Sequence, residues 1–540
     1  MRFSLSVLLV LLVLASLVSA ERTMPLSGDW RFILDPENEG IEQQWFNKKL
    51  PDTINLPAST DQRGKGPFYQ QPTVGKLTRE HSYEGAAWYQ REVKIPSAWS
   101  HSRVILFLER CHWKSSLWVD GQFIGDQDSL SVPQQYDLGG SMTPGVHTLT
   151  LRVDNSYLYD IGRWAHSLTD ETQTNWNGLI GRIELRETSP VWLDSVQAYP
   201  DVERQLLRVT ARAVSALTQP AQAEFSVRLG DSNTRQQVSL APGTTQLEVT
   251  IPFPRGAKLW EEGSPNLTEL AVALRGEDFG ASKEVALGLR DFGAEGRHFT
   301  LNGHPFYVRG NLECCIFPKT GYPPMQADSW EALIKANQAW GVNNLRFHSW
   351  CPPEAAFEAA DKLGCTFQVE LPCWLGENVD EATRDFLRRE AFRIVDTYGN
   401  HPSFCLLSLG NEHGATNRDW LMELLEQLCD ADPRHLYTCQ SHPSDLTRSD
   451  DFFETAGTEK GIIRGLGSAG STTDFDFKQA LVDYSRPVIT HELTQWESYP
   501  PFSQIASYTG HLLPLNFQSY KQSLEANGLA EYADAFVAAS

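Results

Sequence analysis

Two glutamates each close a short apolar run, and this setting predicts chemistry. Glu412 ends the stretch FCLLSLGNE that begins at Phe404, and Glu492 ends the stretch PVITHE that begins at Pro487. In a barrel of parallel strands, the C-terminal ends of the strands share one face, which carries the active site. Two carboxyl groups on opposite sides of a sugar are what cleavage of a glycosidic bond requires. The sequence therefore predicts a catalytic carboxylate pair, provided that the chain builds such a barrel.

The residues after about 290 alternate between apolar strand-like runs and amphipathic helices. The strand candidates are Phe306–Gly310, Asn343–His348, Cys365–Leu371, Phe404–Gly410, Leu436–Gln440, Gly461–Gly465 and Pro487–His491. The helix candidates are Ser329–Trp340, Glu354–Leu363, Glu381–Tyr398, Asp419–Cys429 and the final stretch Phe517–Ala539. This alternation predicts a parallel sheet, and active-site residues at strand ends favour a (β/α)8 TIM barrel over an open sheet. Because only seven strands are recognisable, we expect the catalytic domain, residues 289–540, to be incomplete.

The preceding residues are divided into short alternating runs separated by Gly, Pro, Asn and Asp. Residues 21–188 contain many strand candidates and the turn pair Asp120-Gly121, which predicts a jelly-roll β-sandwich of the sugar-binding type. Residues 189–288 repeat this pattern over about 100 residues, the size of an immunoglobulin-like β-sandwich. That second segment has few candidate catalytic residues, so we expect it to be a spacer.

Length and charge restrict the class of protein further. At 540 residues the chain exceeds one hydrophobic core, so two to four domains are expected. The formal net charge of −22 is spread along the chain, which makes nucleic acid and anionic membranes poor partners. Residues 1–20 have the pattern of a signal peptide, with a membrane anchor as the weaker alternative, so we expect a secreted or periplasmic protein without a membrane span. The sequence leaves a homo-oligomer open.

The nine cysteines do not form a recognisable disulfide framework. Eight of them lie between residues 314 and 439, and Cys365, Cys405 and Cys439 fall inside apolar strand-like runs. Buried thiols are ordinary core residues in such runs. Zinc binding is the weaker alternative, because no Cys-x-x-Cys pair with a matching second pair is present.

The order of the domains and four motifs resemble glycoside hydrolase family 2, which includes β-galactosidases, β-glucuronidases and β-mannosidases. The motifs are the hairpin Leu117–Gly125, the barrel entry Leu301–Gly310, the stretch Gly341–His348 with its N-x-x-R pattern, and Asn400–Ser403 leading into Ser408–Glu412. The resemblance implies that Glu412 is the acid/base after the fourth strand and that Glu492 is the nucleophile after the seventh. Counting strands from the sequence places both glutamates after the same two strands.

The resemblance also implies supporting roles in substrate binding. Asn411 would hydrogen-bond the 2-hydroxyl of the sugar, and Arg346 would pair with the nucleophile and favour its ionised form. A solvated loop carboxylate for Glu412, a structural ion pair for Glu492, a turn asparagine and a core salt bridge are the alternatives. His348, Trp350 and Trp374 would form a platform for the sugar, or else be core or loop aromatic residues.

No cofactor and no metal are expected. Glu313 and Glu370 end strands on the predicted active face, where one of them would hold a sugar hydroxyl, with Mg²⁺ as the weaker alternative. The chain departs from the family at His348-Ser349-Trp350-Cys351-Pro352, where Ser-His-Tyr-Pro is common. Such departures leave the identity of the sugar open.

Two functions remain in view. The first is a secreted, retaining exo-β-glycosidase, β-galactosidase-like, that hydrolyses terminal β-linked sugars by double displacement. The second is a catalytically inactive carbohydrate-binding protein or a defective fragment of such an enzyme, because an open barrel leaves strand edges unpaired.

Overall fold

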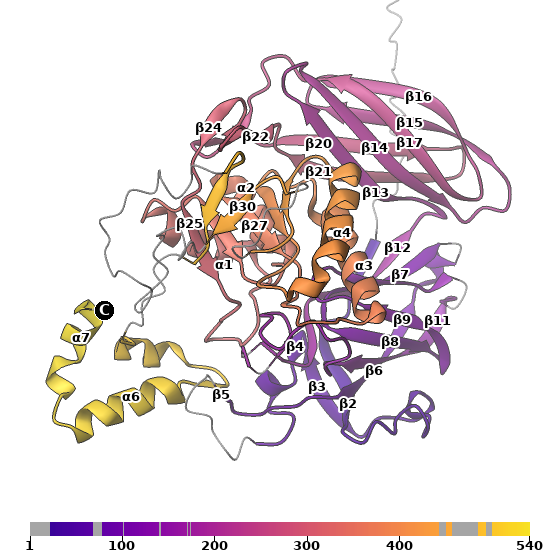
Figure 1. Cartoon of the computed structure of the whole chain (residues 1–540). Coiled ribbons are helices and arrows are strands. Elements are labelled where there is room, and N and C mark those ends of the chain that lie inside the picture. Colours follow the sequence, from indigo (N-terminus) through magenta and orange to yellow (C-terminus); the bar gives the residue numbers. More distant parts are fainter. Residues whose placement is uncertain are drawn as a thin grey trace, which may run out of the picture.

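The computed structural model describes residues 22–68, 78–100, 102–139, 142–169, 171–172, 174–441, 450–455, 484–492 and 499–539. The predicted signal peptide and the predicted strand Gly461–Gly465 lie outside these residues. Figure 1 shows two β-sandwiches at the N-terminal side of the sequence and a mixed α/β part after them. The predicted multidomain architecture of sandwiches followed by a parallel α/β domain is thus confirmed at this level.

The first sandwich consists of two antiparallel sheets. One contains β1 (Arg22–Pro25), β4 (Ala58–Ser59), β7 (Arg103–His112), β10 (Gln134–Asp137) and β12 (Gly178–Thr188). The other contains β2 (Gly28–Asp35), β3 (Asp52–Leu56), β6 (Ala86–Ile95), β8 (Lys114–Val119), β9 (Gln122–Asp128) and β11 (Gly145–Asp154). The side chains that point inward, such as Trp30, Tyr89 and Leu151, are almost fully buried and form one core. Alternation of apolar and polar residues along each strand produces this two-sheet packing.

The second sandwich is smaller. Its first sheet contains β13 (Val191–Asp201), β14 (Leu206–Ser215) and β17 (Gly243–Pro252). Its second sheet contains β15 (Ala221–Leu229), β16 (Ser232–Leu240), β20 (Thr268–Arg275) and β21 (Gly280–Leu287). The small hairpin of β18 (Trp260–Glu261) and β19 (Ser264–Pro265) lies between β17 and β20 in the chain. The antiparallel sheet of β22 (Phe292–Glu295), β23 (His298–Leu301) and β24 (His304–Phe306) follows the sandwich and precedes the α/β part.

The α/β part contains seven parallel strands among the described residues. Five form a continuous ladder: β25 (Gly310–Glu313), β26 (Asn344–Phe347), β27 (Thr366–Glu370), β28 (Phe404–Ser408) and β29 (Leu436–Thr438). The other two, β30 (Phe453–Thr455) and β31 (Val488–Thr490), pair with each other. The helices between strands are α1 (Ala327–Gln338), α2 (Glu354–Leu363), α3 (Glu381–Tyr398) and α4 (Arg418–Ala431). Their apolar faces pack on the ladder, with Phe357, Phe386 and Leu425 fully buried.

Two strand predictions differ from the structure. The predicted strand Phe306–Gly310 is wrong: β24 ends at Phe306, and the first parallel strand starts only at Gly310. Apolarity is misleading here because β25 itself is exposed and polar, with the sequence GNLE. The strand β30 has no counterpart in the prediction. The helix predictions Glu354–Leu363 and Glu381–Tyr398 are confirmed at both ends.

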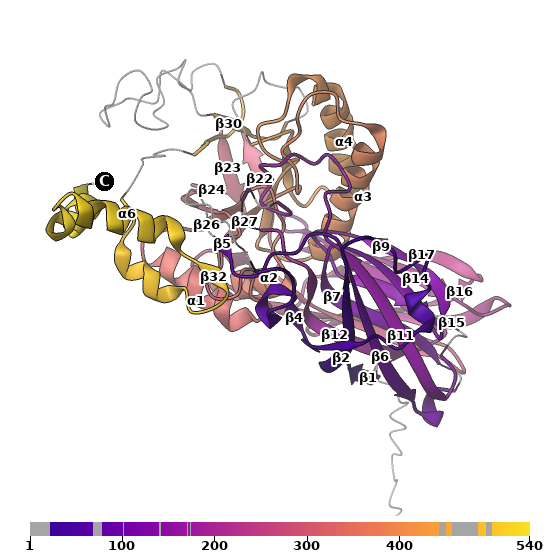
Figure 2. The same cartoon turned by 90° about the horizontal axis from the view of Figure 1, so that it is seen from below.

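The last described segment lies beside the first sandwich. It contains the short strand β32 (Leu512–Leu513), the helices α6 (Leu515–Ala526) and α7 (Ala533–Ala539), and the 3₁₀ turns Phe502–Ser507 and Ala530–Tyr532. The strand β32 pairs with β5 (Thr78–Arg79), and α6 and α7 project away from the rest of the molecule in Figure 2. The predicted helical stretch Phe517–Ala539 thus consists of two helices with a 3₁₀ turn between them. Among the described residues, no helix combines the length and the apolar character needed to cross a membrane.

Asn400 and Arg434 join the second sandwich to the α/β part. Asn400 donates to the Val196 carbonyl at 2.7 Å and accepts from the Ala198 amide at 2.9 Å. The buried Arg434 guanidinium donates to Asp432, to Asn400 Oδ1 at 2.8 Å and to Gln197 Oε1 at 2.7 Å. The first residue of the Asn400–Ser403 motif therefore holds two domains together.

The buried ion pair between Arg434 and Asp432 leads to a prediction about stability. Burial raises the pKa of Asp432, but the neighbouring His435 and Arg434 charges outweigh that effect and lower the pKa. Arg434→Met leaves the Asp432 carboxylate buried without its cation, and we expect it to lower the free energy of unfolding by about 3–5 kcal/mol in urea titrations. The exposed pair Arg204–Asp201 is the control, because Arg204→Met should cost at most about 1 kcal/mol. An equally small effect of Arg434→Met would contradict the structural role.

Candidate active site

Glu412 and Glu492 follow parallel strands at their C-terminal ends, as the sequence predicts. Glu412 lies four residues after β28, the fourth strand, and Glu492 lies two residues after β31, the seventh described strand. Both residues have left-handed backbone conformations, with φ of 45° and 46°. A non-glycine residue in this region costs about 1–3 kcal/mol, and such strain is concentrated at functional sites. The positions of the two carboxylates therefore require strained backbone conformations at Glu412 and Glu492.

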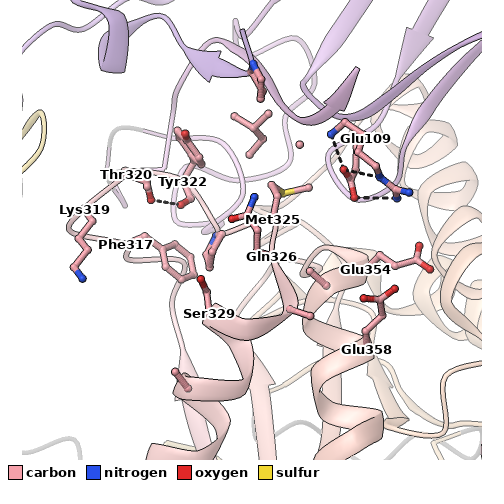
Figure 3. A pocket seen from close by; sticks show the side chains of 18 of the residues that line it. Glu109, Phe317, Lys319, Thr320, Tyr322, Met325, Gln326, Ser329, Glu354 and Glu358 are labelled. Carbon is pink, nitrogen blue, oxygen red and sulfur yellow. Dashed lines mark hydrogen bonds and ion pairs between the residues drawn. The ribbon is translucent and has the colours of Figure 1, made fainter. Parts of the chain in front are cut away.

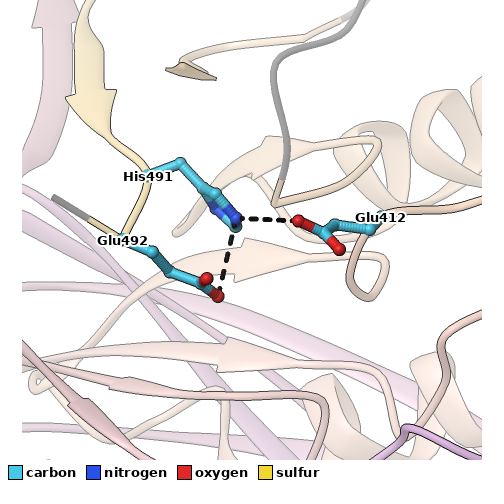
Figure 4. A group of neighbouring side chains, drawn as sticks. All are labelled: Glu412, His491 and Glu492. Carbon is cyan, nitrogen blue, oxygen red and sulfur yellow. Dashed lines mark ion pairs between the residues drawn. The ribbon is translucent and has the colours of Figure 1, made fainter. Parts of the chain in front are cut away.

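His491 lies between the two carboxylates. Its Nε2 is 3.4 Å from Glu412 Oε1 and 3.5 Å from Glu492 Oε1, and its side chain is fully buried (Figure 4). The nearest ligand atoms of the three residues all lie within 4.8 Å of one another. The structure thus brings together two acidic groups that lie far apart in the sequence, with an imidazole next to both.

Arg346, on β26, connects the site residues. Its Nε donates to Glu370 Oε1 at 2.6 Å, its Nη2 donates to Asn411 Oδ1 at 2.7 Å, and its Nη1 lies 3.3 Å from Glu492 Oε1. Only 10% of the arginine side chain is exposed, so little water screens this charge. The planar guanidinium fixes the relative positions of its three partners.

The surroundings of Glu492 determine its charge. Burial on its own raises the pKa of this carboxyl group. The hydrogen bond from His348, whose Nε2 is 3.1 Å from Glu492 Oε1, and the positive charges of His491 and Arg346 act in the opposite direction and prevail. The pKa of Glu492 therefore lies well below its usual range, and the group is ionised at neutral pH.

Asn411 is fully buried and lies directly before Glu412. Its Oδ1 accepts from Arg346, which orients the amide, while its Nδ2 has no hydrogen-bond partner within the described part of the chain. A buried donor without a partner costs about 1–3 kcal/mol. An acceptor supplied by a ligand would remove that cost.

Glu370 does not contact solvent, which corrects its predicted role in binding a sugar. Its Oε1 accepts from Arg346 and from Ser441 Oγ at 2.5 Å, and its Oε2 accepts from the Ser349 amide at 2.5 Å. Because the group is completely buried with both oxygens occupied, it orients Arg346 and is not available to a substrate.

Trp350 is also misplaced in the prediction. Its ring packs in the core against Phe317, Trp330 and Phe347, and its Nε1 donates to the Glu313 carbonyl at 3.1 Å. These core aromatic residues enclose the ring, so it offers no face to a sugar. The same aromatic residue types pack protein cores and bind sugars, so the sequence alone does not distinguish the two roles.

His348 and Trp374 do lie together at the site. Their rings are 5.4 Å apart, and Trp374 is half-buried. A third ring, His166, comes from the loop between β11 and β12 of the first sandwich and lies 4.4 Å from His348. Burial and the neighbouring His348 and Arg346 lower the pKa of His166 to about 3, so this ring is neutral. One wall of the site therefore belongs to the N-terminal sandwich.

Several of these contributors have no clear signal in the sequence. His166, Ser349 and Ser441 are ordinary polar residues in their local segments. One sequence signal exists for Ser349. The chain has His348 followed by Ser349, whereas the family that the chain resembles commonly has Ser-His in its Ser-His-Tyr-Pro pattern.

The donor set bears on the expectation that no metal is needed. Glu412, His491 and Glu492 are a mixed nitrogen and oxygen set, whereas Mg²⁺ prefers oxygen ligands alone. Arg346 and His348 already contact the same oxygen of Glu492 that faces His491, so a cation there would meet a fixed positive charge. At Glu313, burial raises the pKa of the carboxyl group to about 7, which weakens it as a ligand. We therefore assign no metal to these residues.

A separate cavity of about 990 Å³ lies between the first sandwich and the α/β part (Figure 3). The residues that line it include the ion pair of Glu109 and Arg182, and also Tyr322, Met325 and Glu354. Neither Glu412 nor Glu492 lines this cavity. We therefore place the chemistry at the strand ends.

Comparison with known proteins supports this picture. Residues 24–188 match the model of the glycosyl hydrolases family 2 sugar binding domain. The chain is 25% identical to a β-glucuronidase of Paenibacillus borealis, covering 79% of this chain and 75% of that relative. A putative β-galactosidase from Bacteroides fragilis has a similar structure, with a TM-score of 0.72, 16% identity, and coverage of 95% of this chain and 78% of that one.

The Bacteroides uniformis β-glucuronidase is another structural neighbour, with a TM-score of 0.65 and 17% identity. The match covers 81% of this chain but only 55% of that enzyme, so this chain spans about half the length of some of the proteins it resembles. The matched sandwich, the relatives along most of the chain and the shared fold all support membership of glycoside hydrolase family 2.

Proposed function

We propose that this protein is a retaining β-glycosidase that hydrolyses terminal β-linked sugars, with its active site on a (β/α)8-type barrel and with export by residues 1–20. Glu412 is the acid/base and Glu492 is the nucleophile. Asn411 holds the 2-hydroxyl of the sugar, and His348 and Trp374 form part of the wall that the sugar contacts. The relatives named above are β-glucuronidases and β-galactosidases, which supports this reaction class.

The observation that carries the proposal is the proximity of two unlike carboxyl groups. Retaining enzymes place the two groups about 5–5.5 Å apart, whereas inverting enzymes place them about 6.5–9.5 Å apart to admit a water molecule. Oxygens of Glu412 and Glu492 within 4.8 Å of each other match the first class. Double displacement by attack of a carboxylate is therefore the mechanism that the geometry supports.

The environments of the two groups match their proposed roles. Glu492 is 5% exposed and bound by Arg346 and His348, which keep it ionised and aimed, as a nucleophile must be. Glu412 is 20% exposed, so a leaving group can reach it. In the first step, Glu412 gives its proton to the glycosidic oxygen while a Glu492 oxygen attacks the anomeric carbon. In the second step, Glu412 takes a proton from water, which displaces Glu492.

Replacing each glutamate tests the two roles. Glu492→Gln should abolish turnover of every β-glycoside, because an amide cannot form the glycosyl-enzyme, while sugar binding measured by calorimetry persists. Glu412→Gln should reduce hydrolysis of substrates with poor leaving groups by about 10²–10⁴-fold, but should affect formation of the glycosyl-enzyme from dinitrophenyl glycosides far less, because that leaving group needs no proton.

Exposed Glu295, on β22, provides the control, and Glu295→Gln should leave the kinetics unchanged. A Glu492→Gln enzyme with normal turnover would overturn the assignment. A wild-type protein that binds sugars but never turns them over would favour the inactive carbohydrate-binding alternative.

The pH dependence provides a second test. The ordinary pKa of a glutamate is 4.5, and that of Glu492 is lowered, so the nucleophile is ionised above that value and is protonated only at more acidic pH. His348→Phe removes the hydrogen bond to Glu492 and should move the acid limb of kcat/KM upward by about 1 pH unit or more. Exposed His304, on β24, is the control, and His304→Phe should leave the profile in place. An unmoved acid limb in His348→Phe would contradict the pairing.

Hydrolysis of a panel of aryl β-glycosides would identify the sugar that the enzyme prefers. Aryl β-galactosides, β-glucuronides and β-mannosides differ only in hydroxyl stereochemistry and in the exocyclic group. We expect one member of the panel to be hydrolysed with a kcat/KM at least about 10²-fold above the others, because a site built around specific hydroxyl groups penalises their absence or inversion. Equal rates for all members would contradict a specific exo-acting site.

A further inference from the structure

We propose that Ser349 is a positioning residue that fixes the His348 proton on Nε2 and so directs a hydrogen-bond donor at the nucleophile Glu492. The kinetic consequences rest on the proposed function, whereas the proton position rests on geometry alone. Ser349 follows β26, is fully buried, and has a left-handed backbone with a φ of 51°.

The first step is the donor that reaches Ser349 from the N-terminal sandwich. The backbone amide of His166 donates to Ser349 Oγ at 3.0 Å. An amide nitrogen can only donate, so Ser349 Oγ must accept here. The single proton of the hydroxyl group is then left for a different partner.

The second step is the direction of that proton. Ser349 Oγ is 3.1 Å from Nδ1 of His348 and 3.4 Å from Nδ1 of His166. The shorter contact identifies His348 as the acceptor. A neutral imidazole carries one proton, so an Nδ1 that accepts requires the proton to be on Nε2.

The third step connects this proton to the chemistry. Nε2 of His348 lies 3.1 Å from Glu492 Oε1 and, when protonated, donates to it. The other tautomer would direct a nitrogen lone pair at the carboxylate. Arg346 lies 3.3 Å from the same oxygen and His491 lies 3.5 Å from it, so the Nε2 proton of His348 joins two other groups that face this oxygen.

Hydrogen bonds to the α/β part hold the loop that carries His166 in place next to Ser349. The Trp374 amide donates to the Ile161 carbonyl at 2.7 Å, and Ser167 Oγ donates to the Pro372 carbonyl at 3.4 Å. Gly162 has a φ of +93°, and a Cβ there would lie 1.7 Å from the Trp374 carbonyl oxygen. Only glycine allows the loop to approach the barrel this closely. The sandwich therefore helps to set the proton configuration at a catalytic group of the barrel.

The test is a double-mutant cycle between Ser349 and His348, measured on kcat/KM of the full-length protein. Ser349→Ala should lower kcat/KM by about 10-fold, which corresponds to the loss of about one hydrogen bond. In a His348→Phe background, Ser349→Ala should have no further effect, because the ring that it orients is gone. Ser349→Gly removes the same hydroxyl group, fits the left-handed backbone better, and should give the same result if Ser349→Ala folds poorly.

The matched control is Ser403, a fully buried serine directly before β28 whose hydroxyl group has no partner in the described residues. Ser403→Ala should leave kcat/KM within about 2-fold of wild type. A loss of less than about 2-fold for both Ser349 variants would overturn the proposal. An equal loss with and without the His348 ring would also overturn it, since a packing defect alone would have that effect.

A spectroscopic measurement separates the role of Ser349 from the proposed function. In ¹⁵N-histidine-labelled protein, NMR should show His348 as the Nε2-protonated tautomer in the wild type and as a mixture in Ser349→Ala. A wild-type protein without glycosidase activity but with that tautomer would contradict the proposed function and leave the role of Ser349 supported. A His348 ring protonated on Nδ1 alone would overturn the role of Ser349, whatever the activity.

Discussion

The buried ion pair between Glu370 and Arg346 is the interaction on which the proposed active site depends. Glu370 is completely enclosed, and a buried carboxylate is tolerated only when it is paired and hydrogen-bonded. Arg346, Ser441 and the Ser349 amide provide that compensation. In return, the guanidinium is fixed in one orientation, from which it reaches Asn411 and Glu492. One buried negative charge thus positions both the Asn411 amide and the proposed nucleophile.

The backbone at the strand ends adds a second constraint. Ser349, Glu412 and Glu492 all have left-handed conformations, which for non-glycine residues together cost several kcal/mol, at about 1–3 kcal/mol each. The strands and helices beneath them supply the compensation through a core of fully buried side chains such as Phe367 and Leu407. The packing energy of the core below the strand ends therefore offsets the backbone strain at Ser349, Glu412 and Glu492.

The parts of the site that depend on chain topology are predictable from the sequence, and those that depend on side-chain packing are not. Glu412 and Glu492 are identifiable because parallel strands bring their C-terminal ends to one face, however far apart they are in sequence. The role predicted for Trp350 is wrong, because burial against Phe347 and Trp330 leaves no trace in local sequence. The first parallel strand is displaced in the prediction, because the apolar run near Phe306 belongs to the antiparallel entry β22–β24.

The contribution of the N-terminal sandwich could not be predicted from the sequence for a different physical reason. His166 reaches the site only because the loop between β11 and β12 lies against the barrel loop at Trp374, and nothing in either segment encodes that contact locally. A family model that describes residues 24–188 as a sugar binding domain does not by itself place them at the reacting groups. With the His166 ring against His348, and the His166 amide on Ser349, the sandwich forms part of the proposed catalytic site. The first sandwich supplies His166, and the α/β part supplies Ser349, His348 and the two glutamates. The proposed site is therefore complete only when the two domains are docked, and a change at their interface should disturb it as a change at a glutamate would.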